Sequence, residues 1–450
     1  MTPRRGAVER DEFDEALSLG NAHVAPQRAQ DPEDYGDAFT LDERAPAPRP
    51  RHRPHGTPWP DARRAAARAA RPAAPRPRPL AQAVGEVLAA PLEALADLPP
   101  FDTSAMDGYA VTGPGPWRLA SGQGLLAGDR AARPLADGTA VRIATGARIP
   151  PGATAVVRTE HAELRPDGTL LTRDARAVRT GQDIRPRGQE CRSGTPLLPA
   201  GAEITPAVVG LAAAAGYDEL SVIPRPRVEV LVLGQELLHR GLPADGRIRD
   251  ALGPMLAPWL QAMGADAFVT RRLGDDAELL YEAVGSSTAQ LIVTTGGTAA
   301  GPVDHVHGVL ARLKADLLVD GVRVRPGHPM LLARLPNGAH VTGLPGNPLA
   351  AVTGLMTLAG PLLSALRGTP AAEDPTAALT EDVTGHPTDT RVIPVVRDRR
   401  RPGAARPLHF TGPAMLRGLA AAHALAVVPP GGARAGDAVA LLPLPWGGTG

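Results

Sequence analysis

The fold is decided by the stretch RVEVLVLGQE, residues 227–236, and by its continuation to Gly368. Val228 to Leu233 form an apolar run that only Glu229 interrupts, which is typical of a strand buried on both faces. Helical and strand-like patterns then alternate up to Gly368, and such alternation indicates a parallel sheet with helices on both sides. Residues 225–369 are therefore predicted to form a doubly wound α/β domain.

The same alternation gives the bounds of the expected elements. Asn347-Pro348 supplies a helix cap followed by a proline at the first helical position. The expected elements are helices over 254–263, 276–284 and 303–314, strands over 267–273 and 291–294, shorter strands near Leu331 and Val341, and one long apolar helix from 348 to the residue before Gly368.

The flanking regions are richer in turns. Residues 101–189 and 370–450 contain short apolar runs between Gly and Pro turns, which predicts a β-rich domain and a C-terminal small β-barrel. Residues 58–100 and 190–224 are predicted to form one mixed domain. They contain helical patterns over 60–70 and 205–216 and a second apolar-periodic stretch over 80–92.

Composition limits the classes of function. The 48 Lys and Arg residues nearly balance 47 Asp and Glu residues, which argues against a nucleic-acid partner held by bulk charge. A single cysteine, Cys191, excludes an internal disulfide and fits a reducing, cytoplasmic setting. No uninterrupted apolar run reaches about 18 residues, so no membrane partner is expected. Residues 1–57 mix charges with proline and alanine, which predicts a disordered tail.

Ligands of an open parallel sheet bind outside the carboxyl ends of its strands. Glycines at these ends let a ligand approach the backbone, and a helix that begins there offers free amides to an anion such as a phosphate. The expected strand ends are Gly234-Gln235-Glu236, Gly274-Asp275-Asp276, Thr295-Gly296-Gly297 and Gly343-Leu344-Pro345-Gly346-Asn347.

Four carboxylates follow these strands and are predicted to gather in one crevice. Carboxylates beside phosphates commonly need a divalent cation, and Mg²⁺ prefers oxygen ligands. The alternative for each strand end is a tight turn, or for the aspartate pair a helix cap. The predicted metal ligands are Glu236, Asp275, Asp276 and Asp304.

A longer motif points to a family. The stretch LPPFDTSAMDGYAV, residues 98–111, closely resembles the signature of the molybdopterin molybdenumtransferase family, which includes bacterial MoeA proteins and the gephyrin E domain. The resemblance covers roughly Trp59 to Trp446. It is supported in the expected order by RIATGA (142–147), GQE (188–190), GQEL (234–237), TGG (295–297), RPGHP (325–329) and LPGNP (344–348).

The resemblance implies an elongated four-domain protomer that forms a homodimer, with the mixed domain at the dimer interface and the α/β domain binding molybdopterin. It implies a transferase that hydrolyses adenylylated molybdopterin and inserts molybdate at the dithiolene sulfurs with Mg²⁺, releasing AMP in molybdenum cofactor biosynthesis. Hand-over to molybdoenzymes, or from upstream cofactor-synthesis proteins, is expected.

The implied active crevice lies between the α/β domain of one subunit and the first two domains of the other. The resemblance implies that Glu236, Asp102, Glu190 and Asp304 are catalytic. For Asp102 and Asp107 taken alone, the alternative is turn capping. The implied substrate-binding residues are Asp107, Thr145, Asp250, Gly296, Gly297, Arg325, His328, Pro345, Gly346 and Asn347.

This chain departs from the family pattern at the same crevice. Family members usually carry an aspartate where Gln235 stands, and lysines where Arg325 and His328 stand. Small polar residues of the family are replaced by Ala251, Leu252 and Ala299, and an expected aspartate is Glu190. Two alternatives therefore accompany the enzyme: a catalytically weakened paralogue that acts as a molybdopterin-binding or scaffold protein, and another nucleotide-dependent hydrolase or transferase on the same fold.

Overall fold

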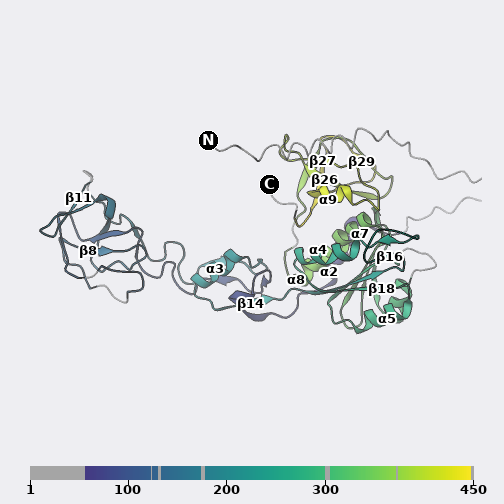
Figure 1. The fold of residues 1–450 in the computed structure, drawn as a ribbon, viewed down its shortest axis with the longest axis horizontal. Coiled ribbons are helices and arrows are strands. Elements are labelled where there is room, and N and C mark those ends of the chain that lie inside the picture. Colours follow the sequence, from purple (N-terminus) through teal and green to yellow (C-terminus); the bar gives the residue numbers. More distant parts are fainter. Residues whose placement is uncertain are drawn as a thin grey trace, which may run out of the picture.

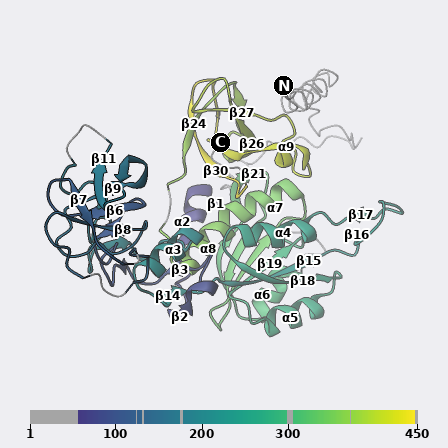
Figure 2. The same ribbon diagram turned by 60° about the vertical axis from the view of Figure 1, so that its left-hand side comes forward.

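The computed structural model describes residues 56–122, 124–129, 133–173, 178–298, 305–370 and 373–446. The chain forms an elongated molecule, with the β-rich part around β8 and β11 at one end and the α/β domain with the C-terminal barrel at the other (Figures 1 and 2). Asp304, Ala299 and nearly all of the predicted tail, 1–57, lie outside the described residues. The predicted domain bounds stay predictions.

The described residues of the α/β domain form a six-stranded sheet. Each of the apolar runs expected from the sequence forms a strand at or within a few residues of its predicted position. In spatial order the strands are β18 (Asp266–Leu273), β15 (Arg227–Leu233), β19 (Leu291–Thr295), β23 (His340–Leu344), β22 (Leu331–Arg334) and β20 (Asp316–Asp320).

Helices cover both faces of this sheet, as expected for buried parallel strands. Val230 and Val232 of β15 pack on one face, and Leu231 and Leu233 pack on the other. Because successive strand residues point to opposite faces, a strand buried on both sides must be apolar throughout. The covering helices are α2 (Trp59–Ala69), α4 (Leu252–Ala262), α7 (Pro348–Gly354) and α8 (Gly360–Arg367) on the first face, and α5 (Ala277–Ser286) and α6 (Val306–Arg312) on the second.

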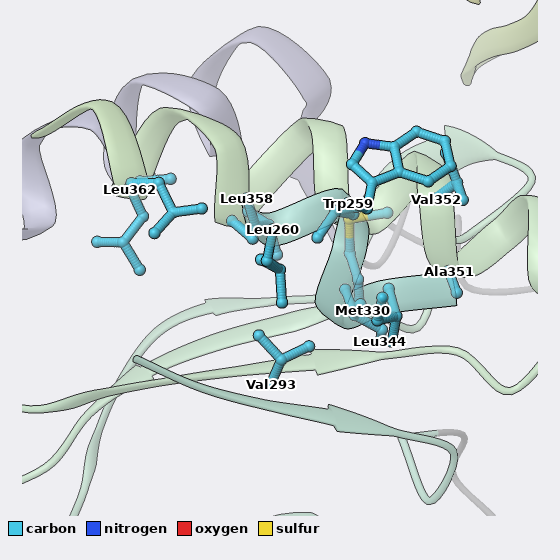
Figure 3. Close-up of a cluster of buried hydrophobic side chains, with 14 of the residues drawn as sticks. Trp259, Leu260, Val293, Met330, Leu344, Ala351, Val352, Leu358 and Leu362 are labelled. Atoms are coloured by element: carbon cyan, nitrogen blue, oxygen red, sulfur yellow. The ribbon is translucent and has the colours of Figure 1, made fainter. Parts of the chain in front are cut away.

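Figure 3 shows the first face, where Trp259 and Leu260 of α4 and Leu358 and Leu362 of the C-terminal helical run lie above Val293. These side chains are at most 1% exposed. Burial of this kind supplies the main favourable free energy of folding, so this layer fixes the position of the sheet under its helices.

Two details differ from the predicted α/β pattern. Strand β22 runs opposite to the other strands of the sheet, because it pairs antiparallel with both β23 and β20. The single long helix expected before Gly368 is divided by a π-helical segment, η3 (Leu355–Ala359). Pro361 has no N–H to bond the carbonyl four residues earlier, which accounts for an irregular turn at this point.

The run Pro348–Arg367 is long and apolar enough to cross a membrane by length and composition, but 78% of its apolar window is buried inside the protein. The preceding contacts with the sheet account for that composition. This run is the central core helix of the α/β domain.

The segments 58–100 and 190–224 meet in a small sheet and one helix. The order β2-β14-β3 joins the two segments, because β14 belongs to the second. The apolar stretch 80–92 forms no helix; it contains a 3₁₀ turn and two short strands, and Gly85 takes a φ of 82° that ends helical geometry. The elements are β2 (Arg76–Pro79), η1 (Leu80–Gln82), β3 (Val87–Leu88), β4 (Leu92–Glu93), β13 (Pro196–Leu198), α3 (Pro206–Ala214) and β14 (Glu219–Ile223).

The β-rich part between these segments holds a six-stranded sheet in the described residues. The order is β10-β11-β7-β8-β6-β9, and a short pair, β5 with β12, lies beside it. The strands are β5 (Thr103–Ser104), β6 (Gly108–Val111), β7 (Trp117–Leu119), β8 (Thr139–Ile143), β9 (Ala155–Arg158), β10 (Ala162–Leu164), β11 (Thr169–Thr172) and β12 (Ile184–Arg185), and the 3₁₀ turn η2 (Thr159–His161) follows β9.

The C-terminal region forms the predicted small barrel. Five strands close on themselves in the order β26-β27-β24-β30-β28, since β28 pairs again with β26. A parallel contact of β21 with β26 joins the barrel to the α/β domain. The elements are β21 (Val322–Arg325), β24 (Thr376–Leu379), β25 (Val383–Thr384), β26 (Thr390–Arg397), β27 (Ala404–Pro407), α9 (Arg417–Ala421), β28 (Ala424–Val428), β29 (Gly432–Ala433) and β30 (Ala438–Pro443).

Helix α2 packs against the α/β domain, far along the chain from the residues it contacts. Trp59 is 8% exposed and its Nε1 donates to Thr357 Oγ1 at 3.0 Å. Arg63 donates to the carbonyl of Met356 and pairs with Asp374 at 3.1 Å. A short strand, β1 (Thr57–Pro58), pairs with β21 just before the helix.

We predict that Trp59→Ala lowers the free energy of unfolding by about 3–5 kcal/mol, because it removes a buried ring and leaves Thr357 without its donor. Arg64→Ala on the same helix removes only an exposed ion pair and should change that free energy by less than about 0.5 kcal/mol. Chemical denaturation followed by circular dichroism measures both. Equal effects of the two substitutions would contradict the packing of α2.

Candidate functional site

The parallel register brings the glycine-rich strand ends together. Val232 of β15 is paired with Thr295 of β19, and Thr295 is paired with Leu344 of β23. The amide of Gly296 donates to the carbonyl of Leu344 at 2.9 Å, which links the turns after these two strands. A Cβ added to Gly346 would lie 3.8 Å from the Cα of Gly296. The turns after three strands therefore form one continuous edge.

Glu236 lies at this edge and depends on Gly234. Gly234 has a φ of 134°, which favours glycine, and a Cβ built there would lie 2.6 Å from Oε2 of Glu236. The carboxylate thus folds back over the glycine at the end of β15. Gly296 and Gly297 also have positive φ values, 82° and 64°. Glycine is required at these turns for their backbone shape.

The aspartate pair after β18 divides into two roles. Oδ2 of Asp275 accepts from the amide of Gln235 at 3.3 Å, so Asp275 lies beside the end of β15. Asp276 caps α5, because its Oδ1 accepts from the amides of Glu278 and Leu279. Within the described ranges, no group of three or more His, Cys, Asp or Glu side chains is arranged to hold a metal ion.

Asp250 is buried and engaged within the chain. Its Oδ1 accepts from the amide of Gly253 at 2.8 Å, and its Oδ2 accepts from Nε of Arg272 at 2.9 Å. The residue is 4% exposed. These contacts tie the start of α4 to the end of β18. Asp250 therefore positions the carboxyl edge of the sheet, and its implied contact with substrate stays a prediction.

A pocket of about 300 Å³ adjoins this edge, at the junction with the barrel. The loop after β21 and the turn after β23 form one side, and barrel residues form the other. Asn347 lines it and makes no side-chain cap with α7. The lining residues are Arg325, Pro326, Gly327, His328, Pro329, Pro345, Asn347, Ala350, Arg391, Thr411 and Pro413.

Two arginines lie on neighbouring strands at the domain junction and line the pocket. Arg325 is the register partner of Arg391 in the parallel contact between β21 and β26. Arg391 donates to the carbonyl of Thr384 and to Thr411 Oγ1. Because neither acceptor is charged, the positive charge of Arg391 is not neutralised by them. A pocket with two guanidinium groups is suited to an oxyanion.

Asp389 positions Arg325. Its Oδ2 accepts from Nε of Arg325 at 2.9 Å, and Asp389 is 5% exposed. Burial opposes ionisation of this carboxyl, but hydrogen bonds from Arg325 and Thr388 and the nearby His386 outweigh it, so the pKa of Asp389 is lowered. The carboxylate is charged at neutral pH and occupies only one edge of the guanidinium.

His328 contributes differently from a lysine. Its Nδ1 lies 2.8 Å from the carbonyl of Val322, and since a carbonyl only accepts, Nδ1 carries a proton. The ring is thereby fixed at the pocket wall. Gly56 leaves room for it, because a Cβ at that position would lie 3.1 Å from Cε1 of the imidazole.

The remaining predicted site residues lie at and next to the β-rich region, and not at the carboxyl edge of the sheet. Asp107 accepts from the amide of Thr145 at 2.6 Å and from its hydroxyl at 2.8 Å. The backbone hydrogen bond, followed by the hydroxyl, lowers the pKa of Asp107. Asp102 accepts from the amide of Arg187, and Glu190 is exposed. Figure 2 places β6, which follows Asp107, and β8, which precedes Thr145, well away from β15, and Figure 1 likewise places β8 far from β18.

The structure thus arranges these predicted residues in three groups. The edge of the sheet holds Glu236, Asp275, Gly296, Gly297 and Gly346. The adjoining pocket holds Arg325, His328, Pro345 and Asn347, and the turns at and near the β-rich region hold Asp102, Asp107, Thr145 and Glu190. Sequence reasoning missed Arg391, Thr411 and Asp389. Nothing in their local pattern marks them, since only the pairing of β21 with β26 brings them to the pocket.

Family comparisons agree with this architecture. Residues 57–216 match the MoeA N-terminal region (domain I and II), residues 229–365 match a probable molybdopterin binding domain, and residues 376–444 match the MoeA C-terminal region (domain IV). These matches and the closed barrel confirm the predicted fold class.

Individual relatives extend over most of the chain. A protein of Mycobacterium tuberculosis named molybdopterin molybdenumtransferase 2 is 34% identical over 371 residues, which are 78% of this chain and 90% of the relative. A molybdopterin molybdenumtransferase of Staphylococcus aureus is 31% identical over 64% of this chain and 71% of its own. The crystal structure of a molybdopterin biosynthesis MoeA protein from Pyrococcus horikoshii has a TM-score of 0.69 at 24% identity, covering 85% and 98% of the two chains, and supports the fold.

We predict that Asp389→Asn weakens binding of an oxyanion such as molybdate by about tenfold, because a neutral amide holds the Arg325 guanidinium less firmly. Isothermal titration calorimetry measures the dissociation constant. Asp398→Asn, just beyond the far end of β26, makes the same change outside the pocket and should leave it unchanged. Equal affinities for all three proteins would show that Asp389 does not act on the pocket.

Proposed function

The chain belongs to the molybdopterin molybdenumtransferase family, and we propose that it inserts molybdate into adenylylated molybdopterin, with release of AMP, in molybdenum cofactor biosynthesis. The observation that carries the proposal is the pocket with Arg325 and Arg391 beside the glycine-rich edge. Molybdate and the phosphates of the substrate are both oxyanions, so two fixed guanidinium groups beside a close backbone approach suit them.

Each part of the site has a task under this proposal. The turns at Gly296, Gly297 and Gly346 admit the pterin phosphate to the backbone, where a side chain would block it. Arg325 and Arg391 hold molybdate within reach of that edge, and His328 and Asn347 line the same pocket. Proximity of two bound reactants is itself a large catalytic contribution.

We propose that two carboxylates at this edge bind Mg²⁺ together with the substrate. Mg²⁺ is commonly held by one or two carboxylates together with substrate phosphates, so a cage made only of protein ligands is not needed. Glu236 and Asp275 lie at adjacent strand ends and would hold it, whereas Asp276 is committed to capping α5. When bound, the ion neutralises charge on the phosphate oxygens of the adenylate. The predicted role of Asp304 stays a prediction, because that residue lies outside the described ranges.

We predict that Glu236→Gln slows turnover of adenylylated molybdopterin about 100-fold, since loss of a metal-linked charge costs on the order of 3 kcal/mol in the barrier. Stability should change little, because Glu236 is exposed. A single-turnover assay of AMP release with molybdate measures the rate. Gln235→Asp restores the usual family carboxylate and should raise the rate or leave it unchanged. A parental rate in Glu236→Gln would remove this residue from the mechanism.

The same assay separates the enzyme from the scaffold alternative. An unsubstituted protein that binds adenylylated molybdopterin but releases no AMP with molybdate would be the weakened paralogue. We propose that the protein acts in the cytoplasm, consistent with its single buried thiol, Cys191, and passes its product to molybdoenzymes.

We further propose a homodimer whose crevice is shared between subunits. Strand β15, which precedes Glu236, and strand β6, which follows Asp107, lie far apart in Figure 2, so a single site containing both residues is easier to form from two chains. Light scattering should therefore give about twice the chain mass of 46.6 kDa. A monomer that is fully active at micromolar concentration would contradict this arrangement.

Subunit complementation tests the shared crevice directly. We predict that Glu236→Gln and Asp107→Asn, each inactive alone, recover about a quarter of the parental activity after unfolding and refolding together, since half of the dimers then carry one intact site. Each variant refolded alone is the control. No recovery, with mixed dimers present by mass spectrometry, would place the whole site within one chain.

A further inference from the structure

A second pocket, of about 420 Å³, lies at the opposite edge of the same sheet. Gln290 precedes β19 and His340 begins β23, so this pocket lies at the amino ends of strands whose carboxyl ends form the proposed active site. The last residue of α2, Ala69, and the chain that follows it form another wall. The lining residues are Ala69, Ala70, Arg71, Ala73, Ser287, Thr288, Ala289, Gln290, Arg334, Asn337, Gly338, Ala339, His340 and Leu366.

His340 presents an unused acceptor at this pocket. The residue is 3% exposed, and its Nε2 lies 3.2 Å from the carbonyl of Ala69, so Nε2 carries the proton. Burial lowers the pKa of His340, which keeps the ring neutral and leaves Nδ1 as an acceptor. Nδ1 is buried and has no hydrogen-bond partner among the described residues. Buried acceptors are usually hydrogen-bonded, and here no described residue supplies the donor.

The charge of the lining is positive. Arg71 and Arg334 line the pocket, and no Asp or Glu is among its lining residues. Arg334 also pairs with Asp316 at 2.9 Å, but both side chains are exposed, and exposed pairs of this kind are weak. None of the ion pairs found in the described part of the chain involves Arg71, which is itself exposed.

The remaining wall is mixed. Alanines at the end of α2 and in the loops before β19 and β23 line the pocket with Leu366 of α8, and the polar residues Ser287, Thr288, Gln290 and Asn337 also line it. Small-molecule sites are commonly pockets of a few hundred Å³ in which apolar wall residues accompany convergent polar groups. The polar groups here require an anion at one position and a hydrogen-bond donor at another.

We propose that this pocket is a second ligand site, separate from the active site, and that it takes a small phosphate ester bearing hydroxyl groups. Arg71 and Arg334 bind the phosphate, a hydroxyl donates to Nδ1 of His340, and the carbon skeleton lies against the alanines and Leu366. The ligand meets the chain at Ala69 to Ala73, where it leaves the α/β domain towards β2. Occupancy therefore restrains one connection between the α/β domain and the mixed domain.

Titration calorimetry of the full-length protein with ribose 5-phosphate tests the proposal, and ribose and inorganic phosphate are the comparison ligands. Ribose 5-phosphate should bind most tightly, since it alone satisfies both the arginines and His340. Arg71→Gln should weaken it about tenfold or more, because a charge-assisted hydrogen bond is lost. Arg68→Gln, an exposed arginine in the last turn of α2 that does not line the pocket, should leave the affinity unchanged.

Two further variants locate the bound ligand. His340→Phe keeps a buried ring but removes the acceptor, so ribose 5-phosphate should then bind no more tightly than inorganic phosphate. Arg391→Gln reports on the pocket at the carboxyl edge. Binding lost in Arg391→Gln but retained in Arg71→Gln would assign the ligand to the active site and overturn the proposal. Absence of binding at millimolar ligand, or equal affinity in Arg71→Gln and the parent, would also overturn it, even if His340→Phe fails to fold.

Discussion

Parallel pairing of β15, β19 and β23 brings Val232, Thr295 and Leu344 side by side, and each glycine-rich turn of the carboxyl edge follows directly after one of these strands. The pairing is held by strands that are apolar on both faces and covered by helices on each side. A shift of one residue would turn every side chain to the other face. The position of the Glu236 turn beside the Gly296 turn is therefore fixed by the core.

The sequence predicts these strands well, because a strand buried on both faces consists of consecutive apolar residues. Helix positions also follow from local signals such as Asn347-Pro348. The pocket beside the edge is different, since the contact of β21 with β26 brings Arg391 to the pocket and Asp389 to Arg325. A pairing between distant segments leaves no local pattern. The strand direction at β22 is likewise set by tertiary packing.

The arginine in place of a family lysine changes how the pocket is held together. A guanidinium has five N–H donors in a planar fork, so Arg325 can donate Nε–H to Asp389 and still offer its other nitrogens to a ligand. A lysine ammonium is a point charge that would be drawn towards Asp389. Arg325 and Asp389 are therefore best understood as a unit, in which the carboxylate holds the remaining N–H donors of the guanidinium at the domain junction.

The two neighbours of the α/β domain are attached differently. The barrel shares strand pairing with it through β21 and β26, so its contribution to the pocket is rigid. The mixed domain meets it through α2, which packs in the core of the α/β domain, and beyond α2 through side-chain contacts such as the pair of Glu203 with Arg367. Such contacts constrain orientation less than a shared sheet does. Under the dimer proposal, contacts with a second subunit help to set the position of the loop that contains Asp107.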